Sequence, residues 1–64
     1  MSYLVATNER LVRWYEFPNL KDPKSFVLHE RLDTRVVSHF KDRETAQKIA
    51  SGANINGNYR FVRF

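Results

Sequence analysis

Two short stretches of the chain place arginines next to aromatic side chains. Residues 10–17 read RLVRWYEF, and residues 59–64 read YRFVRF. Aromatic rings can stack on the bases of a single-stranded nucleic acid while Arg and Lys bind its phosphates. The same residue types also stabilise a small β-sheet, where rings pack between strands and cations keep the surface solvated. The two stretches therefore indicate either a binding surface or ordinary sheet packing.

The elements that must position these side chains follow from the apolar pattern. Five strands are predicted from runs of β-forming residues bounded by turn residues, at 3–7, 10–17, 25–32, 36–41 and 58–64. The polar segment 18–24, with a proline near each end, is a predicted loop.

One helix is predicted between the fourth and fifth strands. Asp42 is its N-cap, and the spacing of Ala46, Ile49, Ala50 and Ala53 is that of one helix face. Gly52 is the predicted left-handed C-cap, and a loop follows at 53–58. The order β-β-β-β-α-β predicts a single α+β domain, 1–64, with a mainly antiparallel sheet of about five strands and one short helix packed on one face.

The pairing of the third and fourth strands decides which side chains face the core. A loop at 33–35 would place Leu32 opposite Val36 and Leu28 opposite Phe40 on one apolar face. His29 would then face His39 on the other side. This register predicts two sets of side chains. The core set is Leu11, Tyr15, Phe17, Leu28, Leu32, Val36 and Phe40, and the open-face set is Arg10, Trp14, His29, Arg31, His39 and Lys41.

The charge balance favours an acidic partner. Eleven Lys and Arg against seven Asp and Glu give a net charge of +4, and no acidic side chain follows Glu44. Such a balance is typical of proteins that bind polyanions or acidic protein surfaces. Cysteine is absent, which excludes disulfides and Cys-based zinc sites. With no signal-like start and no long apolar run, we expect a cytoplasmic protein that does not enter a membrane.

Catalytic and metal-binding patterns are poor. His29 and His39 supply too few ligands for zinc, and both lie in exposed strand positions that do not suit a Ser-His-Asp arrangement. Asp42 and Glu44 at a helix N-terminus are explained by capping and by the helix dipole. A single sheet with one helix offers no enclosed pocket of the usual size. We therefore expect no enzyme, no metal, no cofactor and no small-molecule substrate.

The segment FKDRETAQKIA, residues 40–50, is similar to the strand-to-helix junction F-x-T-x-x-E-A in the arm-binding domains of phage-type integrases. Those small β-β-β-α modules read DNA, so the resemblance implies DNA binding. It covers about a sixth of the chain and departs from the pattern where Thr45 separates Glu44 from Ala46. In size and build the chain also resembles small phage-encoded inhibitors, anti-CRISPR proteins among them, which implies a protein target.

These observations predict a non-enzymatic binding domain whose basic, aromatic sheet face contacts nucleic acid, with single strands favoured. The predicted platform is Arg10, Trp14, Arg31 and Lys41, with Arg60 and Arg63 as phosphate contacts. The alternative is a small phage-type inhibitor or adaptor that docks on a host protein complex.

Overall fold

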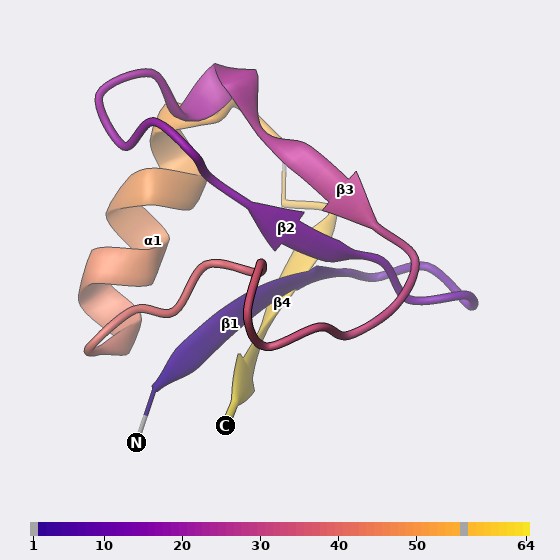
Figure 1. Ribbon diagram of the computed structural model, residues 1–64. Coiled ribbons are helices and arrows are strands. Elements are labelled where there is room, and N and C mark those ends of the chain that lie inside the picture. The colour runs from indigo at the N-terminus through magenta and orange to yellow at the C-terminus, as the bar shows by residue number, and fades with distance from the viewer. Residues whose placement is uncertain (1, 56) are drawn as a thin grey trace.

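The computed structural model describes residues 2–55 and 57–64 as a four-stranded antiparallel sheet with one helix on one face (Figure 1). The elements are β1 (Tyr3–Thr7), β2 (Trp14–Glu16), the 3-10 helix η1 (Pro23–Ser25), β3 (Val27–His29), α1 (Arg43–Gly52) and β4 (Tyr59–Arg63). The strand order is β3-β2-β1-β4. The α+β class and the single packed helix are confirmed. The predicted fifth strand is not found within the described ranges.

The predicted strand 36–41 is wrong, because its first half is a turn. The Asp33 carbonyl accepts hydrogen bonds from the backbone amides of Val36 and Val37 at 3.0 and 3.1 Å. The Asp33 side chain accepts a further bond from the Arg35 backbone amide at 3.0 Å. A hydrogen bond from the Arg35 guanidinium also lowers the pKa of Asp33 below its ordinary value. These local bonds outweigh the β-propensity of the two valines.

The second half of that segment lies between β1 and β2. The backbone amide of Ser38 donates to the Tyr15 carbonyl at 3.3 Å, and the Phe17 amide donates to Ser38 Oγ at 2.7 Å. On the other side, Tyr3 and Phe40 exchange two backbone bonds of 2.8 and 2.9 Å. Residues 38–40 therefore form hydrogen bonds to both β1 and β2 at the end of the sheet where these two strands do not pair with each other.

The predicted register of the third strand is also wrong. β3 pairs with β2, so that Trp14 lies opposite His29, Tyr15 opposite Leu28 and Glu16 opposite Val27. The expected pairs Leu28–Phe40, Leu32–Val36 and His29–His39 do not form, because residues 33–36 turn away before a hairpin with β3 can close.

The core lies between the sheet and α1 and is largely aromatic. Tyr15, Phe17 and Phe40 are buried as predicted, and the rings of Phe17 and Phe40 meet edge-on with centroids 5.9 Å apart. Leu28 is half-buried and packs against this cluster. The prediction is wrong for three aliphatic residues, whose exposed fractions are 85% at Leu11, 42% at Leu32 and 40% at Val36. The predicted register also places Val37 opposite Arg31 on the open face, but Val37 is buried.

The helix forms largely as predicted. Asp42 caps it by accepting a hydrogen bond from the Thr45 amide at 2.7 Å, and the buried alanines let α1 pack closely against β1 and η1. Gly52 is not the left-handed C-cap, since that conformation occurs at Asn54, with φ of 57°. A Cβ at Gly52 would lie 2.9 Å from Pro23 Cγ, so glycine permits the close approach of η1. The predicted loop 53–58 includes Asn56, which lies outside the described residues.

None of the helices in the described part of the chain has the length and hydrophobicity of a membrane-spanning helix.

Replacing Phe40 should weaken the fold far more than replacing Leu11, although the apolar pattern places both in the core. Phe40→Ala removes a buried ring from the core, and we expect a loss of about 3–5 kcal/mol in the free energy of unfolding. Leu11→Ala, the matched control, should change it by about 0.5 kcal/mol or less. Urea unfolding followed by circular dichroism measures both. Equal losses would contradict the core assignment.

Acid should remove the contribution of Asp42 to helix stability. The hydrogen bond from the Thr45 amide lowers the pKa of Asp42 in the folded protein. Its contribution is therefore present above the unfolded pKa, about 3.9, and is lost as the pH falls through the lower folded value. Asp42→Ala should reduce Tm at pH 7 and have less effect in strong acid. Asp42→Asn, which still caps, should reduce Tm less. A Tm deficit of Asp42→Ala that is independent of pH would argue against this.

Candidate functional site

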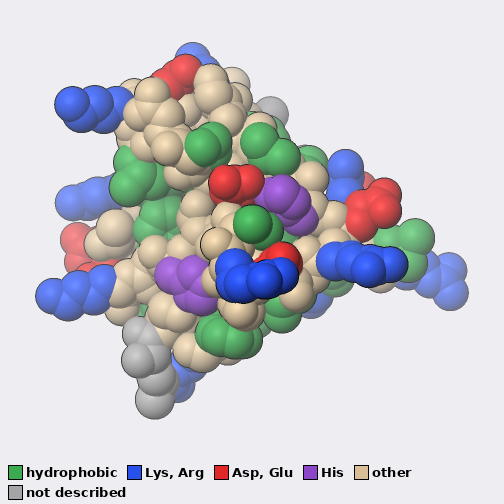
Figure 2. Space-filling model, in the orientation of Figure 1, with side chains coloured by type: hydrophobic (Ala, Val, Ile, Leu, Met, Phe, Trp, Pro, Cys, Tyr) green, Lys and Arg blue, Asp and Glu red, His purple; other side chains and the backbone are tan. Residues whose placement is uncertain are grey.

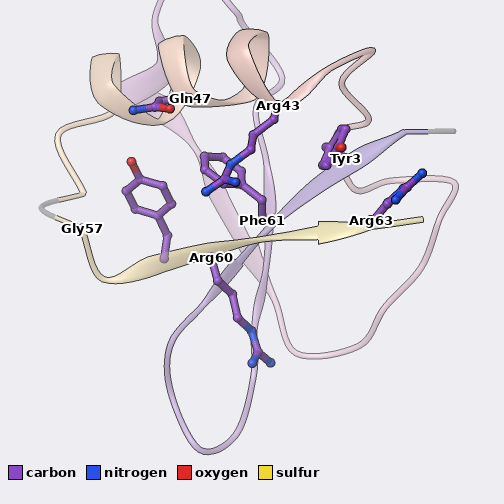
Figure 3. A pocket seen from close by; sticks show the side chains of 8 residues that line it. Tyr3, Arg43, Gln47, Gly57, Arg60, Phe61 and Arg63 are labelled. Atoms are coloured by element: carbon purple, nitrogen blue, oxygen red, sulfur yellow. The ribbon is translucent and has the colours of Figure 1, made fainter.

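An open groove with a volume of about 560 Å³ runs between α1 and β4 (Figure 3). It exists because α1 packs mainly against β1 and η1, which leaves the side chains of β4 only partly covered. Among the described residues that line the groove, none is acidic. The lining residues are Tyr3, Arg43, Gln47, Gly57, Tyr59, Arg60, Phe61 and Arg63.

The ladder between β1 and β4 sets the direction of each side chain on β4. Val5 lies opposite Phe61, and Tyr3 lies opposite Arg63. Because side chains alternate along a strand, Phe61 and Arg63 leave β4 on the helix side and Arg60 leaves it on the other. In Figure 3, Arg43 reaches from α1 toward Phe61, whereas Arg60 points away from the helix. Arg60 therefore lies at the rim of the groove.

The groove has an aromatic floor with a cation held over it. The guanidinium carbon of Arg43 lies 5.3 Å from the centroid of the Phe61 ring, a cation–π distance. The Tyr59 ring meets Phe61 edge-on, with centroids 5.4 Å apart. A guanidinium group stacked on a ring still has N–H donors free along its own edge. These donors lie in one plane and can bind the oxygens of a phosphate or a carboxylate.

Arg60 also belongs to a second surface, on the sheet face away from α1. Ala6 lies opposite Arg60 on one side and opposite Trp14 on the other, and Trp14 in turn lies opposite His29. Residues opposite one another share a face, so His29, Trp14, Ala6 and Arg60 form one row across the sheet. Trp14 is half-buried in this row, and Arg60 is exposed.

The other predicted platform residues are dispersed. Arg10 is exposed in the connection between β1 and β2, where it lines a separate hollow of about 470 Å³ with Leu11 and Glu30. Arg31 is exposed just after β3, and Lys41 is exposed just before the helix cap. None of these three is among the described residues lining the groove. The expected shared strand face is lost because Arg10 precedes the start of β2, and Arg31 and Lys41 follow the end of β3.

The two histidines have separate hydrogen-bond partners. His29 Nε2 lies 2.8 Å from Glu16 Oε1. His39 Nε2 lies 2.8 Å from the Thr34 carbonyl oxygen, and its Nδ1 lies 3.1 Å from the Ser2 hydroxyl oxygen. Within residues 2–55 and 57–64, no three His, Cys, Asp or Glu side chains group as a metal site. Both histidines are visible in Figure 2, on a face where basic, acidic and hydrophobic side chains are mixed.

Sequence reasoning missed Arg43 and Gln47 as site residues. They are four residues apart on α1 and both exposed, so they share one helix face. That spacing predicts only that the two side chains lie on the same side of the helix. It did not reveal that this face borders β4, because the position of the helix over the sheet depends on packing.

Comparisons of the chain with known protein families, with curated proteins and with solved structures found no match.

Proposed function

We propose that this chain is a non-enzymatic domain that binds single-stranded nucleic acid in the groove between α1 and β4. One observation carries the proposal: Arg43 and Arg63, with Arg60 at the rim, line the same groove as the Tyr59 and Phe61 rings, and none of the described lining residues is acidic. Guanidinium groups suit phosphates, and half-exposed rings suit unstacked bases.

A single strand fits this arrangement better than a duplex. Base–ring stacking requires bases that have left a helical stack, as they do in single strands and loops. The groove is also short, since it follows β4 over five residues, or about 17 Å. The net charge of +4 would add long-range attraction to any polyanion.

Trp14 is the proposed second contact. It lies on the same sheet face as Arg60, with only Ala6 between them. A strand that leaves the groove past Arg60 would reach the Trp14 ring. Arg10, Arg31 and Lys41 remain proposed contacts that add positive potential without lining the groove.

A protein target is the second candidate function, as for a small inhibitor or adaptor. The position of β4 at one end of the sheet favours it, because an edge strand can pair with a strand of another chain.

Reversing two groove charges should weaken nucleic-acid binding more than reversing two charges elsewhere. Arg60→Glu with Arg63→Glu removes two proposed phosphate contacts, and Arg10→Glu with Arg31→Glu makes the same change in net charge outside the groove. We expect the groove variant to lower affinity for a deoxythymidine oligonucleotide more. It should also flatten the log–log salt dependence by about 1.4, or about 0.7 per phosphate.

Fluorescence anisotropy at several salt concentrations gives both quantities. Equal effects of the two variants would mean that only net charge matters and that the groove is not the site. A wild-type protein that does not bind at low salt would end the nucleic-acid proposal, because electrostatic attraction is least screened there.

Removing the Trp14 ring should cost binding energy without unfolding the domain. Trp14→Leu keeps an apolar side chain in a half-buried position, and we expect it to weaken oligonucleotide binding by about 1–3 kcal/mol, the usual contribution of one stacked base. Trp14→Phe, which retains a ring, should recover most of this. Isothermal titration calorimetry measures the affinities, and thermal melting checks the fold. Should Trp14→Leu bind as tightly as wild type, Trp14 is not a contact.

A further inference from the structure

The hydrogen-bond ladder of β4 determines which of its backbone groups point outward. Ser2 and Phe64 exchange two backbone bonds, of 3.1 and 2.8 Å, across the β1–β4 pair. Bonded residues alternate in an antiparallel ladder, so Arg60 and Val62 direct their backbone groups toward β1. Phe61, between them, directs its N–H and C=O toward the open edge of the sheet.

Phe61 is the centre of this edge. At one end, Asn8 Nδ2 already donates to the Tyr59 carbonyl at 3.2 Å. The opposite edge of the sheet is β3, which is only three residues long, whereas β4 has five. Long edges with outward backbone groups are where added strands pair. β4 is therefore the better edge for an added strand.

The groove restricts the chemistry of such a strand. Side chains placed opposite Phe61 and Arg63 would enter the groove beside Arg43, and a side chain opposite Arg60 would meet a second guanidinium on the other face. A second copy of this chain would bring the same arginines and another +4 to the junction. Carboxylates opposite Arg60 and Arg63 would instead give charge-assisted pairs.

We propose that the β4 edge binds an acidic, extended peptide segment of a protein partner as an antiparallel fifth strand, lying beside α1. This inference rests on the second candidate function, binding to a protein target, and specifies which part of the target would bind at the β4 edge. Reading along the peptide, the register requires an acid opposite Arg63, an apolar residue opposite Val62 and a ring opposite Phe61. An acid opposite Arg60 and a ring opposite Tyr59 complete it.

The probe is the synthetic peptide acetyl-Glu-Val-Phe-Glu-Tyr-amide carrying a fluorescent label, measured by anisotropy against the whole chain. N-methylation of its central Phe removes the donor to the Phe61 carbonyl and should weaken binding about tenfold or more. N-methylation of its Val, whose N–H would point away from β4, is the matched control and should change affinity little. A difference between the two methylated peptides would be specific to strand pairing, because a surface that only binds nucleic acid does not distinguish their backbone N–H groups.

A charge exchange tests the register. Arg60→Glu with Arg63→Glu should lose the acidic peptide and bind acetyl-Lys-Val-Phe-Lys-Tyr-amide instead, whereas Arg10→Glu with Arg31→Glu should keep the original preference. Failure of the exchanged peptide to bind the exchanged protein would contradict the proposed register.

Equal binding of the two methylated peptides overturns strand addition but keeps peptide docking by charge. No binding of any peptide at low salt overturns both strand addition and an acidic peptide partner. An oligonucleotide titrated into the same preparation reports nucleic-acid binding separately, whichever result the peptides give.

Discussion

Ser38 and Phe40 bond to two different strands, and the rest of the sheet depends on this bridging. Ser38 bonds to Tyr15 of β2 and to Phe17, the residue after β2, whereas Phe40 bonds to Tyr3 of β1. β1 and β2 pair directly at Ala6 and Trp14 and then diverge. The bridging segment satisfies backbone groups that the divergence would leave without partners. It also places the Phe40 ring in the core.

Because β2 and residues 38–40 occupy one side of β1, β4 pairs along the other side and is the edge strand of the sheet. α1 does not cover this edge, because its alanine face packs closely on β1 and Gly52 brings it against Pro23 of η1. Arg43, the first residue of α1, then lies over Phe61. The basic, aromatic groove is thus a consequence of packing that also stabilises the fold.

Local signals in the sequence were sufficient for some elements and not for others. Asp42 with the alanine spacing predicts α1, and runs of β-forming residues near the termini predict β1 and β4. The segment 36–41 was mispredicted because Val36 and Val37 have strand propensity. The chain bends there because Asp33 accepts hydrogen bonds through its carbonyl and its side chain, and the spacing of apolar residues does not reveal such bonds. Within the candidate groove, Arg60 and Arg63 could be proposed from their own strand. Arg43 could not, since its position depends on how α1 packs over the sheet.

Whether ligands bind in the groove between α1 and β4 can be measured by titrating a deoxythymidine oligonucleotide into ¹⁵N-labelled protein and following the amide chemical shifts by NMR. We expect saturable shifts that are largest at Arg43, Gln47 and along β4, with smaller ones at Trp14. Shifts confined to the connection between β1 and β2 around Arg10, or no saturable shift at low salt, would contradict binding in the groove.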